Sequence, residues 1–90
     1  MTSYSELLTA YNSAKADLPL ALSYEADNRL EDTDPAIDVL LKKWHVWDTH
    51  LISVAIRAAV TTYAEGMRQC VTNGEVAWTA LPVELQPPHP

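Results

Sequence analysis

The longest helical pattern in the sequence is too long for a chain of this size. Apolar residues recur at three- and four-residue spacing from Ile37 to Val71. An unbroken helix over residues 35–72 would be about 55 Å long, whereas a compact domain of this length is about 30 Å across. Either the helix breaks, with Asp48-Thr49 as the favoured place because both residues can cap a new helix, or it stays whole and pairs with another subunit.

Start and stop signals define the helices around this pattern. An Asp-Pro pair at 34–35 suits the cap and first position of a helix. Gly74 suits the left-handed residue that often follows a helix end. Near the N-terminus, Ser3 and Glu6 match a capping box, and the apolar stripe behind them predicts a helix over residues 4–17.

The stretch after Pro19 has two interpretations. Good helix formers favour a second helix over residues 19–31, with Pro19 at its first position. Alternation of apolar residues instead favours a strand at 20–26, paired with a second strand at 75–80. We therefore expect an all-α fold, a small helical bundle with one long C-terminal helix that is either continuous or broken; the alternative is α+β with that two-stranded pairing. Residues 1–81 are predicted to form a single domain and residues 82–90 a proline-rich tail.

The second half of the long pattern is apolar on more than one face. A helix of this kind is normally covered on nearly all sides, and short partner helices within the chain cover little of it. Gly66 and the small residues in line with it would let another backbone approach closely, either the first helix or a second subunit. We expect a homodimer or larger oligomer, with an interface formed by Leu51, Ala55, Ile56, Ala59, Val60, Thr62, Tyr63, Gly66 and Met67.

Charge limits the class of partner. The formal net charge is −6, which disfavours direct binding to nucleic acid or to an anionic membrane. Residues 1–38 hold eight acidic and two basic side chains, so the acidity belongs to one end of the sequence. The lone Cys70, the lack of a signal-peptide pattern and the lack of an apolar run long enough for a membrane span suggest a cytoplasmic protein.

The acidic run before the long helix is the strongest candidate for a binding surface. It offers carboxylates to a protein partner with a basic surface, and its proposed contact residues are Glu25, Asp27, Glu31, Asp32 and Asp34. The alternative is that these residues form a solvated loop and a helix cap. If they bind, the acids can occupy a basic site on the partner.

Catalytic patterns are weak in this sequence. The sequence contains only two glycines, too few for a glycine-rich phosphate-binding loop. No serine, threonine or cysteine lies in a known catalytic motif. His45, Asp48 and His50 are clustered residues of metal-ligand types, but the two histidines lack the spacing of a zinc site. We expect that the chain binds no metal and no cofactor and has no enzymatic activity.

The function predicted is that of a small acidic protein-binding module, which acts as a regulator, adaptor or inhibitor. The alternatives are a structural subunit of a self-assembling complex and a metal-dependent enzyme that uses those three residues.

Overall fold

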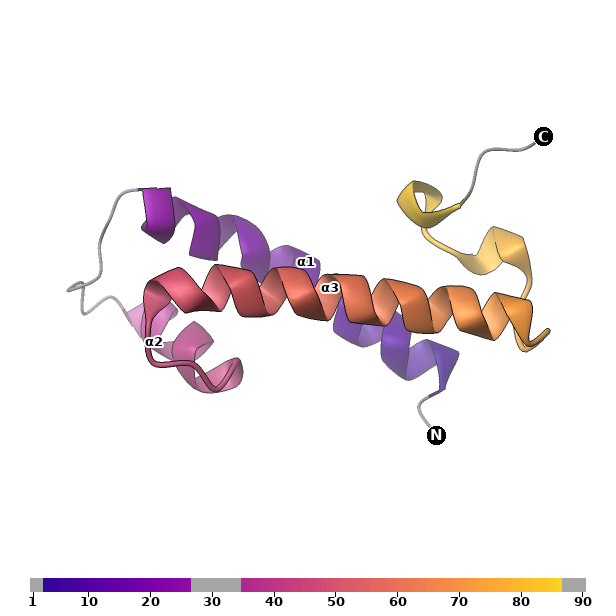
Figure 1. Cartoon of the computed structure of the whole chain (residues 1–90), viewed down its shortest axis with the longest axis horizontal. Helices are drawn as coiled ribbons and strands as arrows, with labels where there is room; N and C mark the ends of the chain where they lie inside the picture. Colours follow the sequence, from indigo (N-terminus) through magenta and orange to yellow (C-terminus); the bar gives the residue numbers. More distant parts are fainter. Residues whose placement is uncertain (1–2, 27–34, 87–90) are drawn as a thin grey trace.

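The computed structural model describes residues 3–26 and 35–86. These residues form three α-helices, α1 (Tyr4–Ala26), α2 (Pro35–Lys43) and α3 (Thr49–Thr72), followed by two short 3-10 helices, η1 (Trp78–Ala80) and η2 (Val83–Leu85) (Figure 1). Within these ranges there is no strand, which confirms the predicted all-α class. The α+β alternative is therefore wrong, because residues 20–26 are helical and residues 75–80 end in η1.

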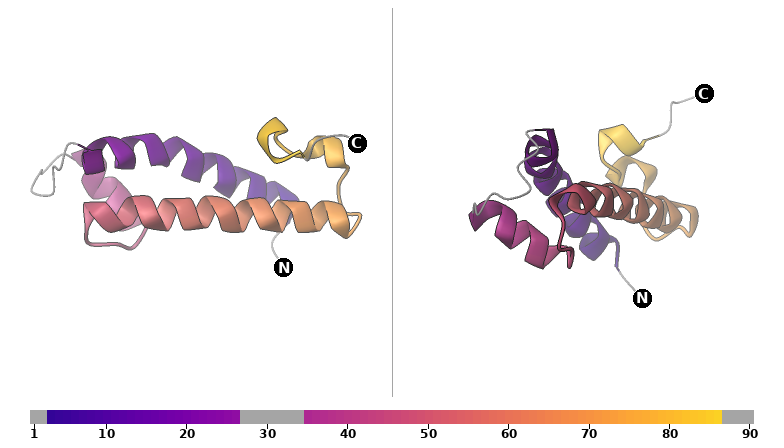
Figure 2. Two further views of the ribbon diagram at one scale, coloured as in Figure 1. Left: turned by 45° about the horizontal axis from the view of Figure 1, so that its top comes forward. Right: turned by 60° about the vertical axis from the view of Figure 1, so that its left-hand side comes forward.

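The two long helices lie side by side and antiparallel. Helix α2 packs at the end where α1 finishes and α3 begins, while η1 and η2 lie against the opposite end of α3 (Figure 2). The molecule measures 47 × 29 × 15 Å along its principal axes. It is therefore flat and elongated, and each long helix keeps a face that its neighbour does not cover.

Pro19 lies inside α1 and does not end it. The boundary predicted near residue 17, with a new helix over 19–31, is wrong; α1 continues to Ala26. A proline within a helix costs about 3 kcal/mol because it removes one backbone N–H and crowds the preceding turn. Ala14 and Ala21 are fully buried on either side of Pro19 and hold both halves of α1 in one core cluster. Packing thus overrides the local preference, and the predicted helix beyond Ala26 lies outside the described residues.

A hydrogen-bonded turn ends α2. The N–H of Val46 donates to the carbonyl of Leu41 (3.1 Å), and the N–H of His45 donates to the carbonyl of Lys42 (3.3 Å). This is the Schellman pattern, in which the residue after the helix adopts a left-handed conformation. His45 has φ 55°, so a non-glycine residue occupies a position that usually favours glycine.

Asp48 begins α3, so the long pattern is broken where the sequence placed the break. The Asp48 side chain accepts a hydrogen bond from the N–H of His50 (2.8 Å). At the other end of α3, Gly74 has φ 78°, and its N–H donates to the carbonyl of Val71 (3.0 Å). The predicted glycine cap is therefore confirmed.

Two apolar clusters form the core, one at each end of the α1–α3 pair. The cluster beside α2 is built from Ala14, Ala21, Tyr24, Ile37, Leu40, Ile52 and Ile56. The cluster beside the C-terminal segment is built from Tyr11, Ala64, Met67, Leu81 and Leu85. The half-buried side chains of Val60 and Tyr63 pack against both and join them.

The C-terminal segment packs on the helices through residue 86. Leu85 is buried in the second cluster, although the prolines predict a tail over residues 82–90. Glu84 forms an ion pair with Lys15, and the Tyr4 hydroxyl donates to the carbonyl of Ala80. The structure thus places residues 82–86 with the helical domain, because the short 3-10 turns accommodate Pro82 while Leu85 still reaches the core. Residues 87–90 lie outside the described part of the chain.

Candidate protein-binding surface

Large apolar side chains are exposed where α3 begins. Trp47 is 92% exposed, Leu51 is 51% exposed and Val54 is 50% exposed. Leu51 and Val54 are three residues apart and therefore neighbours on the helix surface, and Trp47 immediately precedes the capping residue Asp48. We call Trp47, Leu51 and Val54 the α3 patch. Leu51 and Val54 are neighbours on α3, and Trp47 lies four residues before Leu51 in the chain; several large exposed apolar side chains in one region of a surface typically mark an interaction site.

The two faces of α3 explain why the α3 patch stays exposed. Ile52 and Ile56 point into the core cluster beside α2 and are fully buried. Leu51 and Val54 lie on the other side of the helix, which no described element covers. Both faces are apolar, and the helices formed by residues 3–26 and 35–86 cover only one of them.

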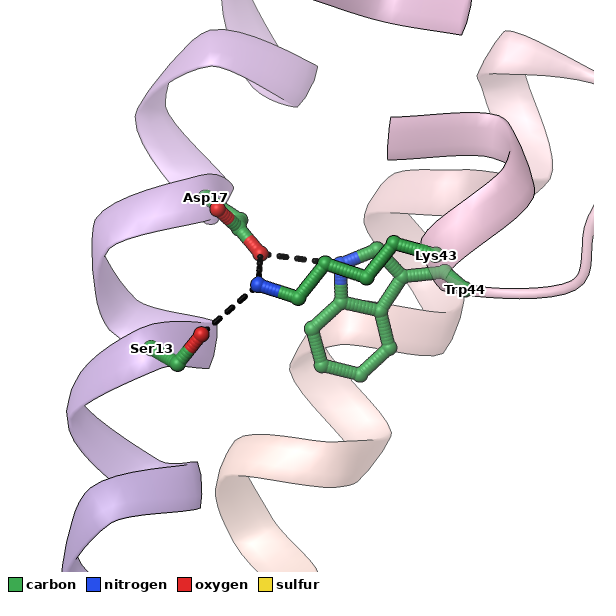
Figure 3. Close-up of polar contacts among 4 residues, drawn as sticks. All are labelled: Ser13, Asp17, Lys43 and Trp44. Carbon is green, nitrogen blue, oxygen red and sulfur yellow. Dashed lines mark hydrogen bonds and ion pairs between the residues drawn. The ribbon is translucent and has the colours of Figure 1, made fainter. Parts of the chain in front are cut away.

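A polar node holds α2, and with it the turn that leads to Trp47, against α1 (Figure 3). Asp17 on α1 accepts hydrogen bonds from the Lys43 ammonium (2.7 Å) and from the Trp44 indole N–H (3.0 Å). The Lys43 ammonium also donates to the Ser13 hydroxyl (2.7 Å). Asp17 is mostly shielded from solvent, so these charge-assisted bonds fix the position of the end of α2.

Glu25 is the one residue of the predicted acidic set that the structure describes. Its carboxylate accepts a hydrogen bond from the buried Ser53 hydroxyl. The other carboxylate oxygen lies 3.6 Å from Nδ1 of His50. Glu25 therefore joins the end of α1 to the first turns of α3, and part of its carboxylate is already committed to these contacts.

The other four predicted contact residues lie outside the described part of the chain. Asp27, Glu31, Asp32 and Asp34 belong to the segment between Ala26, which ends α1, and Pro35, which begins α2. The end of α1 and the beginning of α2 both lie at the end of the molecule where α3 begins (Figure 1). The acidic segment is thus tethered to the same end as the α3 patch.

The residues predicted to form an oligomer interface divide into three groups in the structure. Ile56 and Met67 are fully buried in the chain's own core, and Gly66 faces Leu7 of α1, whose methyl carbons would lie 3.2 Å from an added Cβ. These three serve packing within the chain, which is the alternative considered for the small residues. Leu51 and Thr62 are exposed, and the remaining residues, Ala55, Ala59, Val60 and Tyr63, are half-buried.

The threonines in the middle of α3 satisfy their own hydroxyl groups. Thr61 donates to the carbonyl of Arg57 (3.1 Å), and Thr62 donates to the carbonyl of Ala58 (2.9 Å). Their hydroxyls therefore need no water partner if another helix covers this face. Ala58 is also exposed here, so Ala58, Thr61 and Thr62 form a small, uncharged stretch of this face beside the exposed Arg57.

The residues considered for a metal site do not converge. His45 lies in the turn after α2, Asp48 uses its carboxylate to cap α3, and His50 lies beside Glu25. No group of three metal-ligating side chains occurs among residues 3–26 and 35–86. In the same ranges no helix is both long and apolar enough to cross a bilayer.

Cys70 is shielded at the end of α3 that contacts the C-terminal segment. Burial, reinforced by the nearby Glu75 carboxylate, raises the pKa of the Cys70 thiol above its ordinary value. A raised pKa keeps the thiol protonated at neutral pH and so unsuited to nucleophilic attack.

Sequence reasoning missed two parts of this surface. It treated Trp47 as part of one continuous stripe, and the stripe is interrupted because His45 adopts a left-handed conformation. It also gave Asp17 no role. The partners of Asp17, Lys43 and Trp44, follow it by 26 and 27 positions in the sequence, and contacts at such a separation leave no local pattern. The exposure of Leu51 had a signal, because the sequence of α3 is apolar on more than one face.

Comparison of the chain with protein-family models, with curated proteins and with solved structures finds no match.

Proposed function

We propose that this chain is a non-enzymatic protein-binding module and that the α3 patch is its principal contact surface. The observation that carries the proposal is the exposure of Trp47, Leu51 and Val54 at one end of the molecule. Tryptophan is enriched among the residues that dominate binding energy at interfaces. Leaving these three side chains in water is unfavourable by about 25 cal/mol per Å² of apolar surface, and a partner that covers them recovers that free energy.

Charge supports a basic partner. The acidic segment joins the fold at the end of α1 and the beginning of α2, at the same end of the molecule as the beginning of α3, and the chain carries a formal charge of −6. Complementary charge speeds association and selects among partners more than it raises affinity. The partner that fits best therefore presents an apolar anchor for Trp47 and Leu51, surrounded by lysine or arginine. Such a module acts as a regulator, adaptor or inhibitor, and its single shielded thiol suits the cytoplasm.

An affinity capture with matched variants tests the proposal. The full chain is the bait in a lysate of its native host, beside a variant with Trp47→Ser and Leu51→Ser. Val83 is 83% exposed and lies on η2, at the other end of the molecule, so Val83→Ser is the matched control. We expect one partner captured by the wild type and by the control, and weakened at least tenfold by the patch variant, since central hot spots contribute about 2 kcal/mol or more. Equal capture by all three baits would refute the assignment of the patch.

A fourth bait tests the acidic segment. It neutralises Asp27, Glu31, Asp32 and Asp34 and keeps Glu25, because the Glu25 carboxylate is needed by Ser53. We expect this variant to associate with the partner more slowly than the wild type, and its association rate to depend less on salt concentration. Unchanged association at low and high salt would show that these acids serve solubility only.

Self-association through α3 is the second candidate. The flat shape leaves one face of α3 uncovered, and the self-satisfied hydroxyls of Thr61 and Thr62 suit burial. In an antiparallel pair centred on Thr61, Arg57 lies opposite Glu65 of the partner subunit, and the symmetry repeats this ion pair. A parallel pair would instead place like charges together.

Exchanging the charges of Arg57 and Glu65 tests whether the chain self-associates as an antiparallel pair. Arg57 and Glu65 are both exposed and eight residues apart, about 12 Å along the helix, so they do not contact each other within one chain. Sedimentation equilibrium is expected to show a dimer for the wild type, a weaker dimer for Glu65→Arg, and recovery when Arg57→Glu is added. A monomer at every concentration, or no recovery in the double variant, would eliminate the antiparallel pair.

A further inference from the structure

A groove runs between the last turns of α3 and the C-terminal segment. Its volume is about 550 Å³, within the range of about 300–1,000 Å³ that is usual for small-molecule sites. The apolar side chains of Val71, Trp78, Leu81 and Leu85 form most of its wall. Leu81 and Leu85 belong to the second core cluster, so this wall is continuous with the core.

Two charged residues, Arg68 and Glu84, line the same groove, and within the described part of the chain only Glu84 is paired. The Glu84 carboxylate forms an ion pair with Lys15 and accepts a hydrogen bond from the Tyr11 hydroxyl (3.2 Å). These contacts, the Lys15 bond first, lower the pKa of Glu84. The Arg68 guanidinium has no hydrogen bond or ion pair with any described residue. An exposed cation without a partner among residues 3–26 and 35–86 therefore borders an apolar groove in a protein whose net charge is negative.

We infer that this groove binds a small amphipathic carboxylate, with the apolar body against Leu81 and Leu85 and the carboxylate against Arg68. Charge complementarity selects this class. Arginine offers a planar pair of donors that matches a carboxylate, and Lys15 already compensates Glu84. A ligand with a cationic head would meet Arg68 with like charge, and a neutral one would leave Arg68 unpaired.

The site is independent of the proposed protein-binding function. It lies at the end of α3 that carries η1 and η2, opposite the end that carries the α3 patch (Figure 2). Either proposal can fail while the other stands.

Titration with decanoate, followed by amide and indole NMR shifts of the full chain, tests the inference. We expect shifts confined to the groove, at Val71, Leu81, Leu85 and the Trp78 indole. Arg68→Gln should weaken decanoate binding about tenfold, the effect of losing one charge-assisted contact. Arg68→Lys should weaken it less. Arg57→Gln is the matched control, because it removes the same charge from an exposed position of α3 outside the groove.

Three results would overturn the inference. The first is an equal loss in the Arg68→Gln and Arg57→Gln variants, with circular dichroism showing both folded. The second is binding of decyltrimethylammonium or decanol as tightly as decanoate. The third is binding that appears only after residues 87–90 are removed, which would assign the groove to the chain's own C-terminal segment.

Discussion

Replacing His45 with glycine is expected to stabilise the fold. His45 follows α2 with φ 55°, and its exposed side chain forms no hydrogen bond or ion pair with any described residue. A residue with a Cβ in this conformation costs about 1–2 kcal/mol. Glycine removes that strain but gives the unfolded chain more freedom, which offsets about 0.5–1 kcal/mol. The net gain is about 0.5–1 kcal/mol, equivalent to a rise of about 3–6 °C in the Tm of a domain this small.

Thermal and urea unfolding of three variants, followed by circular dichroism, measures this effect. His45→Ala keeps a Cβ and is expected to show no gain, so it separates relief of strain from loss of the imidazole. His45→Asn should fall between, because asparagine tolerates the left-handed region. If His45→Gly is no more stable than His45→Ala, the left-handed turn does not exist in solution, and the account of the break between α2 and α3 fails.

Three further predictions concern the end of the molecule that carries the C-terminal segment. Gly66→Ala should stabilise α3 by up to about 1 kcal/mol, because the flexible Leu7 methyls can move from the added Cβ; Gly66→Ile should destabilise it by about 1–3 kcal/mol, and urea unfolding measures both. The pKa of Glu84 is lowered in the folded state, so its contribution is present above its ordinary pKa and is lost as the pH falls through the folded value. Glu84→Gln should therefore flatten the acid side of the stability profile, and an unchanged slope would contradict this. Cys70 should resist iodoacetamide at neutral pH until the protein unfolds, because burial raises its pKa; rapid labelling of native protein would refute that placement.

Sequence reasoning predicted the elements whose causes are local. The Asp48 cap, the glycine at position 74 and the apolar period of α3 each depend on a few neighbouring residues, and all appear in the structure. The serine cap of α1 is also present, since the N–H of Glu6 donates to the Ser3 hydroxyl (3.2 Å).

The errors arose where tertiary contacts decided the result. Pro19 predicted a boundary, but burial of Ala14 and Ala21 keeps α1 continuous. The prolines after Leu81 predicted a free tail, but Leu85 reaches the core through a short 3-10 turn. Neither contact has a signature in the neighbouring sequence.

The candidate surface was only partly predictable for the same reason. The presence of apolar residues on more than one face of α3 indicated an interface, and the exposed part of α3 includes Leu51. Which of the apolar residues serve the chain's own core depended on the path of α1, which buries Ile56 and Met67. The groove beside Arg68 had no signal, because it forms only when the C-terminal segment folds back onto α3.

Site-specific photocrosslinking in the native host tests the central claim most directly. A photoreactive residue is placed at position 51, at position 54 and, as a control, at the exposed position 16 on α1. The account predicts a discrete protein adduct from positions 51 and 54 and none from position 16; an adduct of twice the mass of the chain would identify a second copy, and any other mass a different partner. No adduct from positions 51 and 54, or the same adducts from position 16, would contradict the assignment of the α3 patch as a protein-binding surface.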